Sequence, residues 1–120
     1  MLTFLLSTYH LYPDSWGIDS SEAQEWGNDW VINHNTACAA VGKPCLLEEF
    51  GFSATCDIMS DWQSTALNAD ATSGDLYWQY GDTLSYGKTH DDGNTAYYGD
   101  DLFTCLVTNH VADIDDACTE

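Results

Sequence analysis

The stretch Pro44-Cys45-Leu46-Leu47-Glu48-Glu49-Phe50-Gly51 brings two adjacent carboxylates to the end of an apolar segment and stops on glycine. Apolar residues enclosed between Gly-Lys-Pro and Gly are typical of a buried strand, which would end here with acid at its tip. Successive side chains of a strand point to opposite faces. We therefore expect one of Glu48 and Glu49 to point into a cavity while the other supports it. The alternative is that both form the solvated end of a strand.

The composition indicates one globular domain and excludes several classes of partner. Of 120 residues, 44% are apolar and 13% aromatic, and 20 acidic residues against 2 basic ones give a formal charge of -18. Nucleic acids and anionic membranes attract clustered Lys and Arg, so neither is an expected partner, whereas a neutral polysaccharide is indifferent to the charge. Without a long apolar run, no membrane span is predicted. Five Trp and seven Tyr suit a dense core or stacking against sugar rings.

The pattern of apolar residues and turn formers predicts alternating strands and helices. The expected strands are residues 2–9, 45–50 and 75–80, the expected helices are 20–41, 57–68 and 100–114, and 81–99 form a polar loop. A repeated βα order calls for parallel strands covered by helices, which is the α/β class. His10, Tyr12, Glu49 and Trp78 then lie at or near the carboxyl ends of strands, where such folds gather their chemistry.

Neither a metal site nor a cofactor site is expected. The loop sequence Asp91-Asp92-Gly93-Asn94 lacks the spaced acids of an EF-hand and predicts a solvated turn. His110 lies on the apolar face of the last predicted helix, where a hydrogen-bonded core histidine is a better explanation than a metal ligand.

The first predicted helix has an apolar stripe that should face the core. Its residues are Trp26, Trp30, Ala37 and Val41.

The five cysteines exceed ordinary cytosolic usage. Because no C-x-x-C pair and no zinc-like spacing with His occurs, disulfides are the better explanation. Cys38 and Cys45 flank the turn before the second strand closely enough to be bonded, and Cys105 could reach back to Cys56. Two disulfides would leave one cysteine over, which indicates a free thiol or a partner outside the chain. Residues 1–6 are too short an apolar run, and too poor in basic residues, for a signal peptide.

Five segments, taken together, closely resemble the fungal endo-β-1,4-mannanases of glycoside hydrolase family 5. They are residues 10–17 (HLYPDSWG), 26–29 (WGND), 42–51 (GKPCLLEEFG), 74–82 (GDLYWQYGD) and 105–111 (CLVTNHV). They occur in the order and spacing of the family, and the match extends to about Ile114. The resemblance implies a (β/α)8 TIM barrel, no cofactor, and retaining hydrolysis of internal β-1,4-mannosidic bonds in β-mannan or a related neutral polysaccharide.

The resemblance also implies roles for single residues. Glu49 would be the catalytic nucleophile at the end of the seventh barrel strand, and Tyr12 would hold it by a hydrogen bond. His10 would line the catalytic subsite, and Trp78 would form the platform beneath the sugar. Trp16 is counted with them as a substrate-binding aromatic. The alternatives are a core role for Trp78, a plain loop position for His10, and a packing or lid role for Trp16.

By the same resemblance, Cys38 pairs with Cys45 and Cys56 with Cys105, whereas Cys118 has no counterpart. The resemblance and the cysteine usage together imply an extracellular, secreted protein whose signal peptide lies upstream.

The chain departs from the family in its length. A (β/α)8 barrel takes about 250 residues, so we expect residues 1–120 to form a single partial catalytic domain: strands 6 to 8 and their helices, the C-terminal three βα units of an incomplete barrel. The Asn-Glu motif that carries the family's acid/base does not occur. Because general acid catalysis is worth on the order of a hundred- to ten-thousand-fold, we expect the chain to be inactive alone.

An opened barrel would expose its inner face and its strand edges. The chain should therefore need the missing N-terminal barrel half, or self-association, to cover them. Two rival functions remain open. One is a non-catalytic carbohydrate-binding module with a platform of Trp16, Trp78 and Tyr12, although such modules are usually β-sandwiches. The other is a decayed barrel remnant that serves only as an interaction protein.

Overall fold

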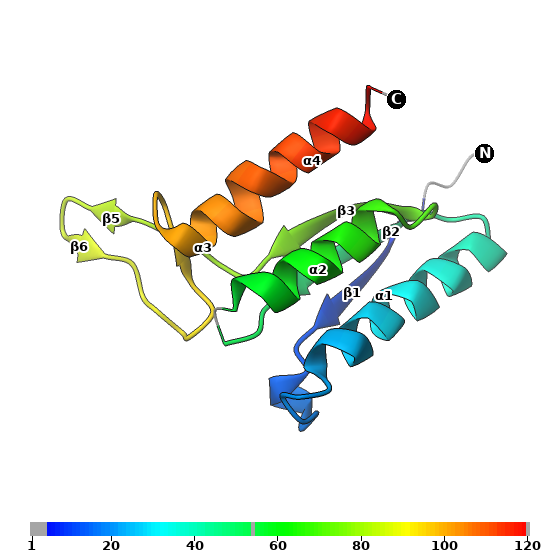
Figure 1. Ribbon diagram of the computed structural model, residues 1–120, viewed down its shortest axis with the longest axis horizontal. Helices are drawn as coiled ribbons and strands as arrows, with labels where there is room; N and C mark the ends of the chain where they lie inside the picture. Colours follow the sequence, from blue (N-terminus) through cyan, green and yellow to red (C-terminus); the bar gives the residue numbers. More distant parts are fainter. Residues whose placement is uncertain (1–4, 54, 120) are drawn as a thin grey trace.

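Parallel strands, each followed by helical structure, form the body of the protein (Figure 1). The computed structural model describes residues 5–53 and 55–119. Within these residues β1 (Ser7–Leu11), β2 (Cys45–Phe50) and β3 (Thr72–Tyr77) form a parallel sheet in the order β1-β2-β3. The helices α1 (Ala23–Ala40) and α2 (Cys56–Leu67) connect them. The predicted α/β order is confirmed, and the sheet of the described part is open rather than closed into a barrel.

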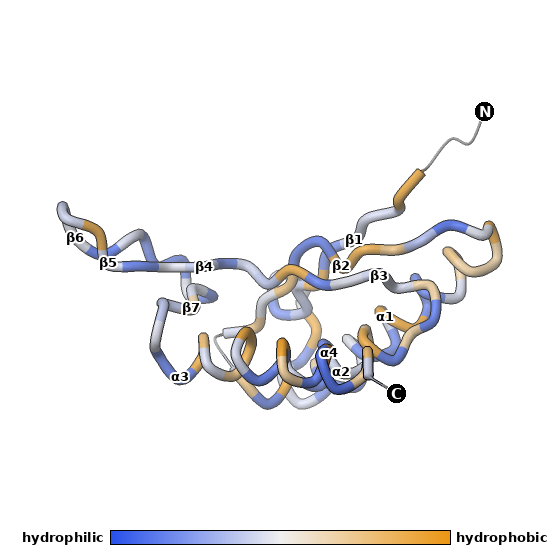
Figure 2. Tube along the Cα trace, turned by 90° about the horizontal axis from the view of Figure 1, so that it is seen from above, coloured by the Kyte–Doolittle hydropathy of each residue, from blue (hydrophilic) through white to orange (hydrophobic). Residues whose placement is uncertain are grey.

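The helices cover one face of this sheet. Figure 2 shows them as a layer beneath the strands, and nothing in residues 5–53 and 55–119 covers the opposite face. The fully buried side chains between the two layers include Leu11, Leu47, Phe50, Met59 and Trp62. Along β2 the buried Cys45 and Leu47 alternate with the half-buried Leu46, which belongs to the uncovered face. The fold therefore has a packed outer side and an open inner side.

The first and third strands are displaced from their predicted positions. β1 begins at Ser7 and includes His10 and Leu11, and the predicted strand residues 2–4 lie outside the described residues. β3 begins at Thr72 and ends at Tyr77, so Trp78 follows the strand. Pairing with the central β2 sets these limits, because a ladder residue needs a partner on that strand. Local propensity does not contain this information.

The buried face of α1 differs from the predicted tryptophan stripe. Its buried residues are Ala23, Gly27, Val31 and Cys38. Val41 lies beyond the helix and is 67% exposed. Small residues face the core here because the Trp62 indole of α2 fills the place that a side chain on Gly27 would occupy. That indole donates a hydrogen bond from Nε1 to the carbonyl oxygen of Gln24 at 3.1 Å.

The predicted polar loop after β3 contains further pairing. Tyr80–Gly81 (β4) pairs in parallel with Ala96–Tyr97 (β7), and Thr83–Leu84 (β5) pairs with Gly87–Lys88 (β6) as an antiparallel hairpin. The hairpin projects away from the helices and the sheet (Figure 1). Strands of two residues are too short to produce a readable hydropathy pattern, so the sequence predicted a loop.

The C-terminal helical stretch is continuous but not uniform. It consists of α3 (Asp101–Phe103), a π-helical segment (Thr104–Asn109) and α4 (His110–Ala117). Asp100 caps it by accepting a hydrogen bond from the Phe103 N–H at 2.7 Å. His110 is buried and pairs with Asp75 of β3 at 2.7 Å, so its predicted core role is confirmed. None of the helices in the described part has the length and apolar character that a membrane span requires.

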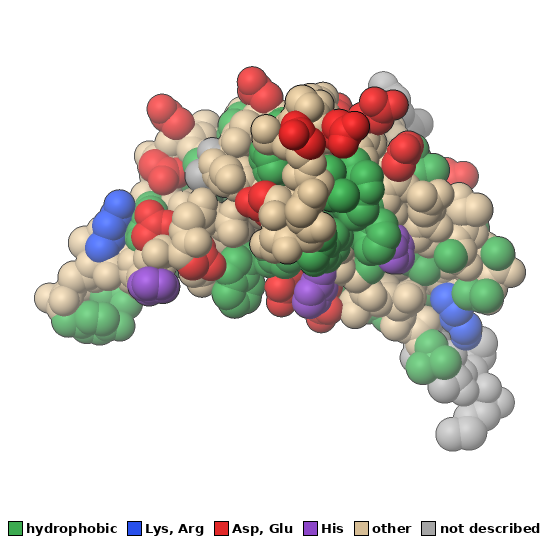
Figure 3. Space-filling view, turned by 90° about the horizontal axis from the view of Figure 1, so that it is seen from below, with side chains coloured by type: hydrophobic (Ala, Val, Ile, Leu, Met, Phe, Trp, Pro, Cys, Tyr) green, Lys and Arg blue, Asp and Glu red, His purple; other side chains and the backbone are tan. Residues whose placement is uncertain are grey.

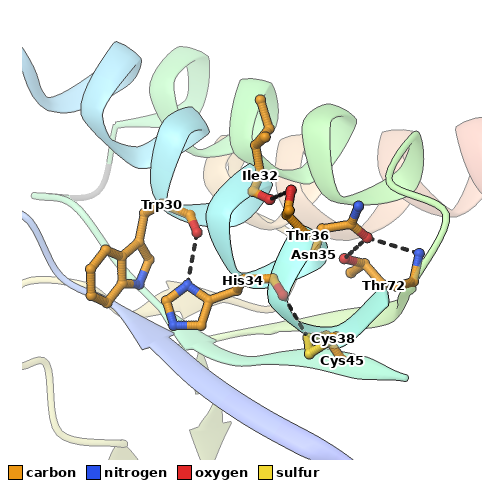
Figure 4. The surroundings of a disulfide bond; sticks show 9 residues. Trp30, Ile32, His34, Asn35, Thr36, Cys38, Cys45 and Thr72 are labelled. Atoms are coloured by element: carbon orange, nitrogen blue, oxygen red, sulfur yellow. Dashed lines mark hydrogen bonds between the residues drawn. A yellow bond between two sulfur atoms is a disulfide. The ribbon is translucent and has the colours of Figure 1, made fainter. Parts of the chain in front are cut away.

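One disulfide ties α1 to the sheet and the other ties α2 to the C-terminal helical stretch. Cys38 is bonded to Cys45 across the turn between α1 and β2, and Cys56 to Cys105 between α2 and the π-helical segment, with Cα–Cα distances of 6.0 and 6.1 Å. Both predicted pairings are confirmed, and Cys118 is an exposed free cysteine. Near the first disulfide, Asn35 of α1 accepts a hydrogen bond from the Ala71 N–H at 2.8 Å (Figure 4). The carboxyl end of α1 is thus tied to the start of β2 and of β3.

Candidate active site

The carboxyl ends of β1 and β2 bring one histidine and two carboxylates together. Nε2 of His10 lies 3.3 Å from Oε2 of Glu48, and Nδ1 of the same ring lies 3.6 Å from Oε2 of Glu49. All three side chains are partly exposed, at 45%, 43% and 33% respectively. In the space-filling view of Figure 3, histidine and carboxylate side chains emerge at the middle of the concave outline. The uncovered side of the sheet therefore carries the polar cluster.

A break in the strand ladder explains how both glutamates reach one imidazole. Tyr9 pairs with Leu47, but the next residue, His10, pairs with Glu49, so β2 carries one residue more than β1 at this point. Such a bulge interrupts the alternation of side chains and re-aims those beside it. The expectation that Glu48 faces away from Glu49 is therefore wrong.

Tyr12 fixes the orientation of Glu49. Its hydroxyl donates a hydrogen bond of 3.0 Å to Oε2 of that carboxylate. Burial, and then the carboxylate that accepts its hydrogen bond, raise the pKa of Tyr12 well above its usual value of 10.0. The phenol consequently stays protonated and remains a donor throughout the neutral pH range. His10 packs edge-on against the Tyr12 ring, with centroids 6.4 Å apart.

Trp78 lies beside this cluster, just past the end of β3. Its backbone N–H donates to the carbonyl oxygen of Phe50 at 2.8 Å, which places it next to the residue that follows Glu49. Its side chain is not a core side chain, because the residue is 41% exposed. The indole N–H donates to Oδ2 of Asp92 at 2.6 Å. The indole is therefore both exposed and held by a hydrogen bond through its N–H.

Trp16 belongs to a different group of aromatic residues. Its ring packs against Trp26 at 5.7 Å and against Trp30 at 5.4 Å, and the last two stack on each other at 5.0 Å. Trp30 in turn donates from Nε1 to the carbonyl oxygen of His10 at 2.8 Å. Trp16 is 45% exposed. Its direct contacts are thus packing contacts, and they support the backbone at His10 from the helix side.

Two residues of this site were not predicted as members. Strand alternation predicts that Glu48 points away from Glu49, and the loop sequence predicts a solvated turn at Asp92. The position of Glu48 depends on the register between β1 and β2, and that of Asp92 on a contact with a residue 14 positions earlier. Neither the strand register nor this contact can be read from a local sequence pattern. No group of three or more His, Cys, Asp or Glu residues within 5–53 and 55–119 is arranged to hold a metal ion.

The open βα sheet, with its carboxylates and aromatic residues at the strand ends, has the arrangement of part of a (β/α)8 barrel enzyme. No known family profile matches the sequence. The chain is 57% identical over 113 residues to a probable mannan endo-1,4-β-mannosidase A of Aspergillus oryzae, covering 93% of this chain and 28% of the relative.

Solved structures show the same fold. An endo-β-1,4-mannanase of Thermotoga petrophila superimposes with a TM-score of 0.81 at 23% identity, over 93% of this chain and 26% of that one. A glycoside hydrolase family 5 mannosidase of Rhizomucor miehei gives 0.77 at 18% identity, over 93% and 38%. The chain therefore matches a C-terminal portion of fungal mannan endo-1,4-β-mannosidases and shares the fold of the solved mannanase structures, and it spans less than a third of the length of the relative it matches.

Proposed function

We propose that this chain supplies the nucleophile half of a retaining mannanase that cleaves internal β-1,4-mannosidic bonds. Residues 1–120 would be a single partial catalytic domain, the C-terminal strands 6 to 8 of the barrel. The observation that carries the proposal is the hydrogen bond from Tyr12 to Glu49 at the end of β2, with His10 beside it. A carboxylate oriented by a permanent donor on the open side of a βα sheet is suited to attack a sugar carbon.

The proposed reaction follows from this arrangement. One Glu49 oxygen attacks the anomeric carbon while the other keeps the Tyr12 hydrogen bond, and the bond to the leaving sugar oxygen breaks. A protonated carboxyl group about 5 to 5.5 Å away has to donate a proton to that oxygen and later take one from the water that releases the product. We assign this acid/base to the part of the barrel that precedes the chain.

Glu49 rather than Glu48 is the proposed nucleophile. Glu49 accepts the hydrogen bond from Tyr12, whereas Glu48 contacts the imidazole of His10. Glu48 is also the more exposed of the two, at 43% against 33%. We therefore give Glu48 the role of holding His10, and His10 the role of lining the catalytic subsite.

The substrate would lie along the uncovered side of the sheet. Trp78 supplies the proposed platform for the apolar face of a mannose ring, because its indole is exposed and fixed through its N–H. A neutral mannan is compatible with the formal charge of -18, which would repel a polyanion. Trp16 would support the site indirectly, through its packing against Trp30. Its exposed part would make a secondary contact with the substrate.

Activity requires the rest of the barrel. In the described residues the outer edges of β1 and β3 have no strand partner, and the inner face of the sheet is uncovered. We propose that the missing N-terminal half, or another copy of the chain, covers these surfaces, and that the isolated chain is inactive. The relatives and the disulfides are consistent with a secreted protein.

The rival functions differ in what they require of the site. A carbohydrate-binding module of the β-sandwich type disagrees with the observed α/β fold. A decayed remnant would keep the fold but would not need Glu49. The two are separated by restoring the barrel: this chain is placed after the preceding five βα units of the Aspergillus oryzae relative, and this protein is called the completed enzyme below.

The test is hydrolysis of β-mannan by the completed enzyme and its variants. Glu49→Ala should reduce kcat by several orders of magnitude, because no other carboxylate accepts the Tyr12 hydrogen bond. The matched control, Glu48→Ala, should reduce kcat far less. Unchanged hydrolysis by Glu49→Ala would remove Glu49 from the mechanism and favour the decayed remnant.

A further inference from the structure

The indole N–H of Trp78 is hydrogen-bonded to the carboxylate of Asp92, a residue that the proposed mechanism does not use. Nε1–H of Trp78 donates to Oδ2 of Asp92 at 2.6 Å, a short hydrogen bond to a charged group. We propose that Asp92 is a positioning residue that fixes the Trp78 indole as a platform for the sugar ring. This inference deepens the proposed function and rests on it.

Asp92 is itself rigidly held in its turn. Its other oxygen, Oδ1, accepts the Asn94 N–H at 3.0 Å and the Thr95 hydroxyl at 3.2 Å. Burial by itself would raise the pKa of Asp92, but the hydrogen bonds from Trp78, Asn94 and Thr95 lower it below its usual value. The carboxylate is therefore ionised at neutral pH and has both oxygens engaged. It cannot turn away from the indole without losing bonds at its other end.

The turn that carries Asp92 is also packed against the strand of the proposed nucleophile. The Asn94 side chain lies so close to Gly51 that a side chain on Gly51 would overlap it. Gly51, two residues after Glu49, donates its N–H to the carbonyl oxygen of Leu11 at 3.2 Å. Residues 91–95 thus connect the end of β2 to the indole beyond β3. Together with the hydrogen bond from the Trp78 N–H to the Phe50 carbonyl oxygen, this contact ties the indole to the strand of the proposed nucleophile.

The rest of the turn is fixed from the other side. Thr95 is 6% exposed and Ala96 fully buried, and the Ala96 N–H donates to the carbonyl oxygen of Gln79 at 2.8 Å. The charge of Asp92 is also among the causes that raise the pKa of Tyr12, the partner of Glu49. Asp92 therefore acts electrostatically on Tyr12, the partner of the nucleophile, as well as holding Trp78, the platform.

Loss of the carboxylate should leave the indole partly disordered before substrate binds. Ordering one side chain on binding weakens affinity by about three- to tenfold, and a misplaced platform would lower kcat as well. In the completed enzyme, Asp92→Ala should therefore lower kcat/KM for mannan by at least about threefold. Asp92→Asn keeps an acceptor oxygen of the same shape and should restore most of kcat/KM. The matched control, Asp91→Ala, removes a neighbouring carboxylate that accepts the Gly93 N–H at 2.9 Å, and should leave kcat/KM unchanged.

A spectroscopic readout separates positioning from a general effect on folding. With 15N-labelled tryptophan, and Trp78 assigned through Trp78→Phe, the indole N–H resonance of Trp78 should lose its downfield shift in Asp92→Ala and largely regain it in Asp92→Asn. The thermal unfolding midpoint should stay close to that of the Asp91→Ala control.

Two results would overturn the inference: unchanged kcat/KM in Asp92→Ala, or an Asp92→Asn variant as impaired as Asp92→Ala. Loss of hydrolysis in Glu49→Ala together with an unaffected Asp92→Ala would leave the proposed function intact and remove only the role of Asp92. Unchanged hydrolysis in Glu49→Ala would instead remove the proposed function.

Discussion

Tyr12 and Glu49 lie 37 residues apart in the chain and are joined by a hydrogen bond of 3.0 Å. The bond crosses from the exit of β1 to the end of β2, so it exists only when these strands pair in their observed register. It connects the fold directly to the proposed chemistry, because it orients the carboxylate that we assign as nucleophile.

Removing the Tyr12 hydroxyl should therefore reduce catalysis without unfolding the protein. In the completed enzyme, Tyr12→Phe is expected to lower kcat/KM by roughly ten- to a hundredfold, since a hydrogen bond to a charged group is worth about 1.5–3 kcal/mol. The control is Tyr86→Phe, which removes the hydroxyl of a tyrosine that is 85% exposed. Equal effects of the two substitutions would show that the bond to Glu49 has no special role.

The contact between Gly27 and Trp62 predicts a change in stability whose sign is informative. Replacing a helical glycine with alanine ordinarily stabilises a helix by about 1 kcal/mol. Here the added methyl group would overlap the Trp62 indole, so Gly27→Ala should lower the free energy of unfolding by about 1–3 kcal/mol. Urea denaturation of the completed enzyme measures this. A stabilised variant would mean that α1 and α2 pack less closely than described.

The disulfides should contribute unequally. Cys56 and Cys105 are 49 residues apart, against 7 for Cys38 and Cys45. On the chain-entropy account, removing the longer-range bond costs about 4 kcal/mol and removing the shorter one about 2 kcal/mol. The paired Cys→Ser variants, compared by urea denaturation, test this order. Cys118→Ser is the control, and a larger loss for the 38–45 pair would contradict the entropic account.

The pair of His110 and Asp75 predicts how stability depends on pH. The hydrogen bond to Asp75, which outweighs the effect of burial, raises the pKa of His110 above its usual value of 6.5, and Asp113 adds to the shift. The folded protein therefore binds this proton more tightly than the unfolded chain. The stabilisation is complete below about pH 6.5 and is lost as pH rises through the raised pKa.

Unfolding of the completed enzyme at a series of pH values, with and without His110→Gln, measures this effect. Asp75 of β3 and Asp113 of α4 act on the charge of His110, Gln63 of α2 donates a hydrogen bond to Asp75, and all three are unchanged in the variant. The fall in stability above pH 6.5 should be larger in the unsubstituted protein. Identical pH profiles would exclude His110 as the titrating group.

The sequence was sufficient where structure is local. The strand 45–50 was predicted with its observed limits, because apolar residues are enclosed by turn-forming Gly and Pro. The helices were predicted to within a few residues, and the disulfide pairs followed from the family resemblance. Gly27 shows the limit of this approach: its place on the buried face of α1 is set by the Trp62 ring, 35 residues later, rather than by helix periodicity.

The site could be predicted only in part, for the same reason. His10, Tyr12 and Glu49 are brought together as the strand order and the resemblance implied. The approach of Glu48 to His10 depends on a bulge that arises when β1 and β2 pair. The hydrogen bond of Asp92 to Trp78 depends on how the turn at 91–95 folds back over β2. Long-range pairing decides both, and no local pattern records it.

The most direct test of the central claim, that Glu49 is the nucleophile, is to trap it. The completed enzyme is incubated with a 2-deoxy-2-fluoro-mannosyl substrate that carries a good leaving group, which slows release of a covalent intermediate, and its peptides are analysed by mass spectrometry. The account predicts a glycosyl adduct on Glu49 that is absent from Glu49→Ala. An adduct on Glu48, or inactivation without any adduct on residues 45–51, would contradict it.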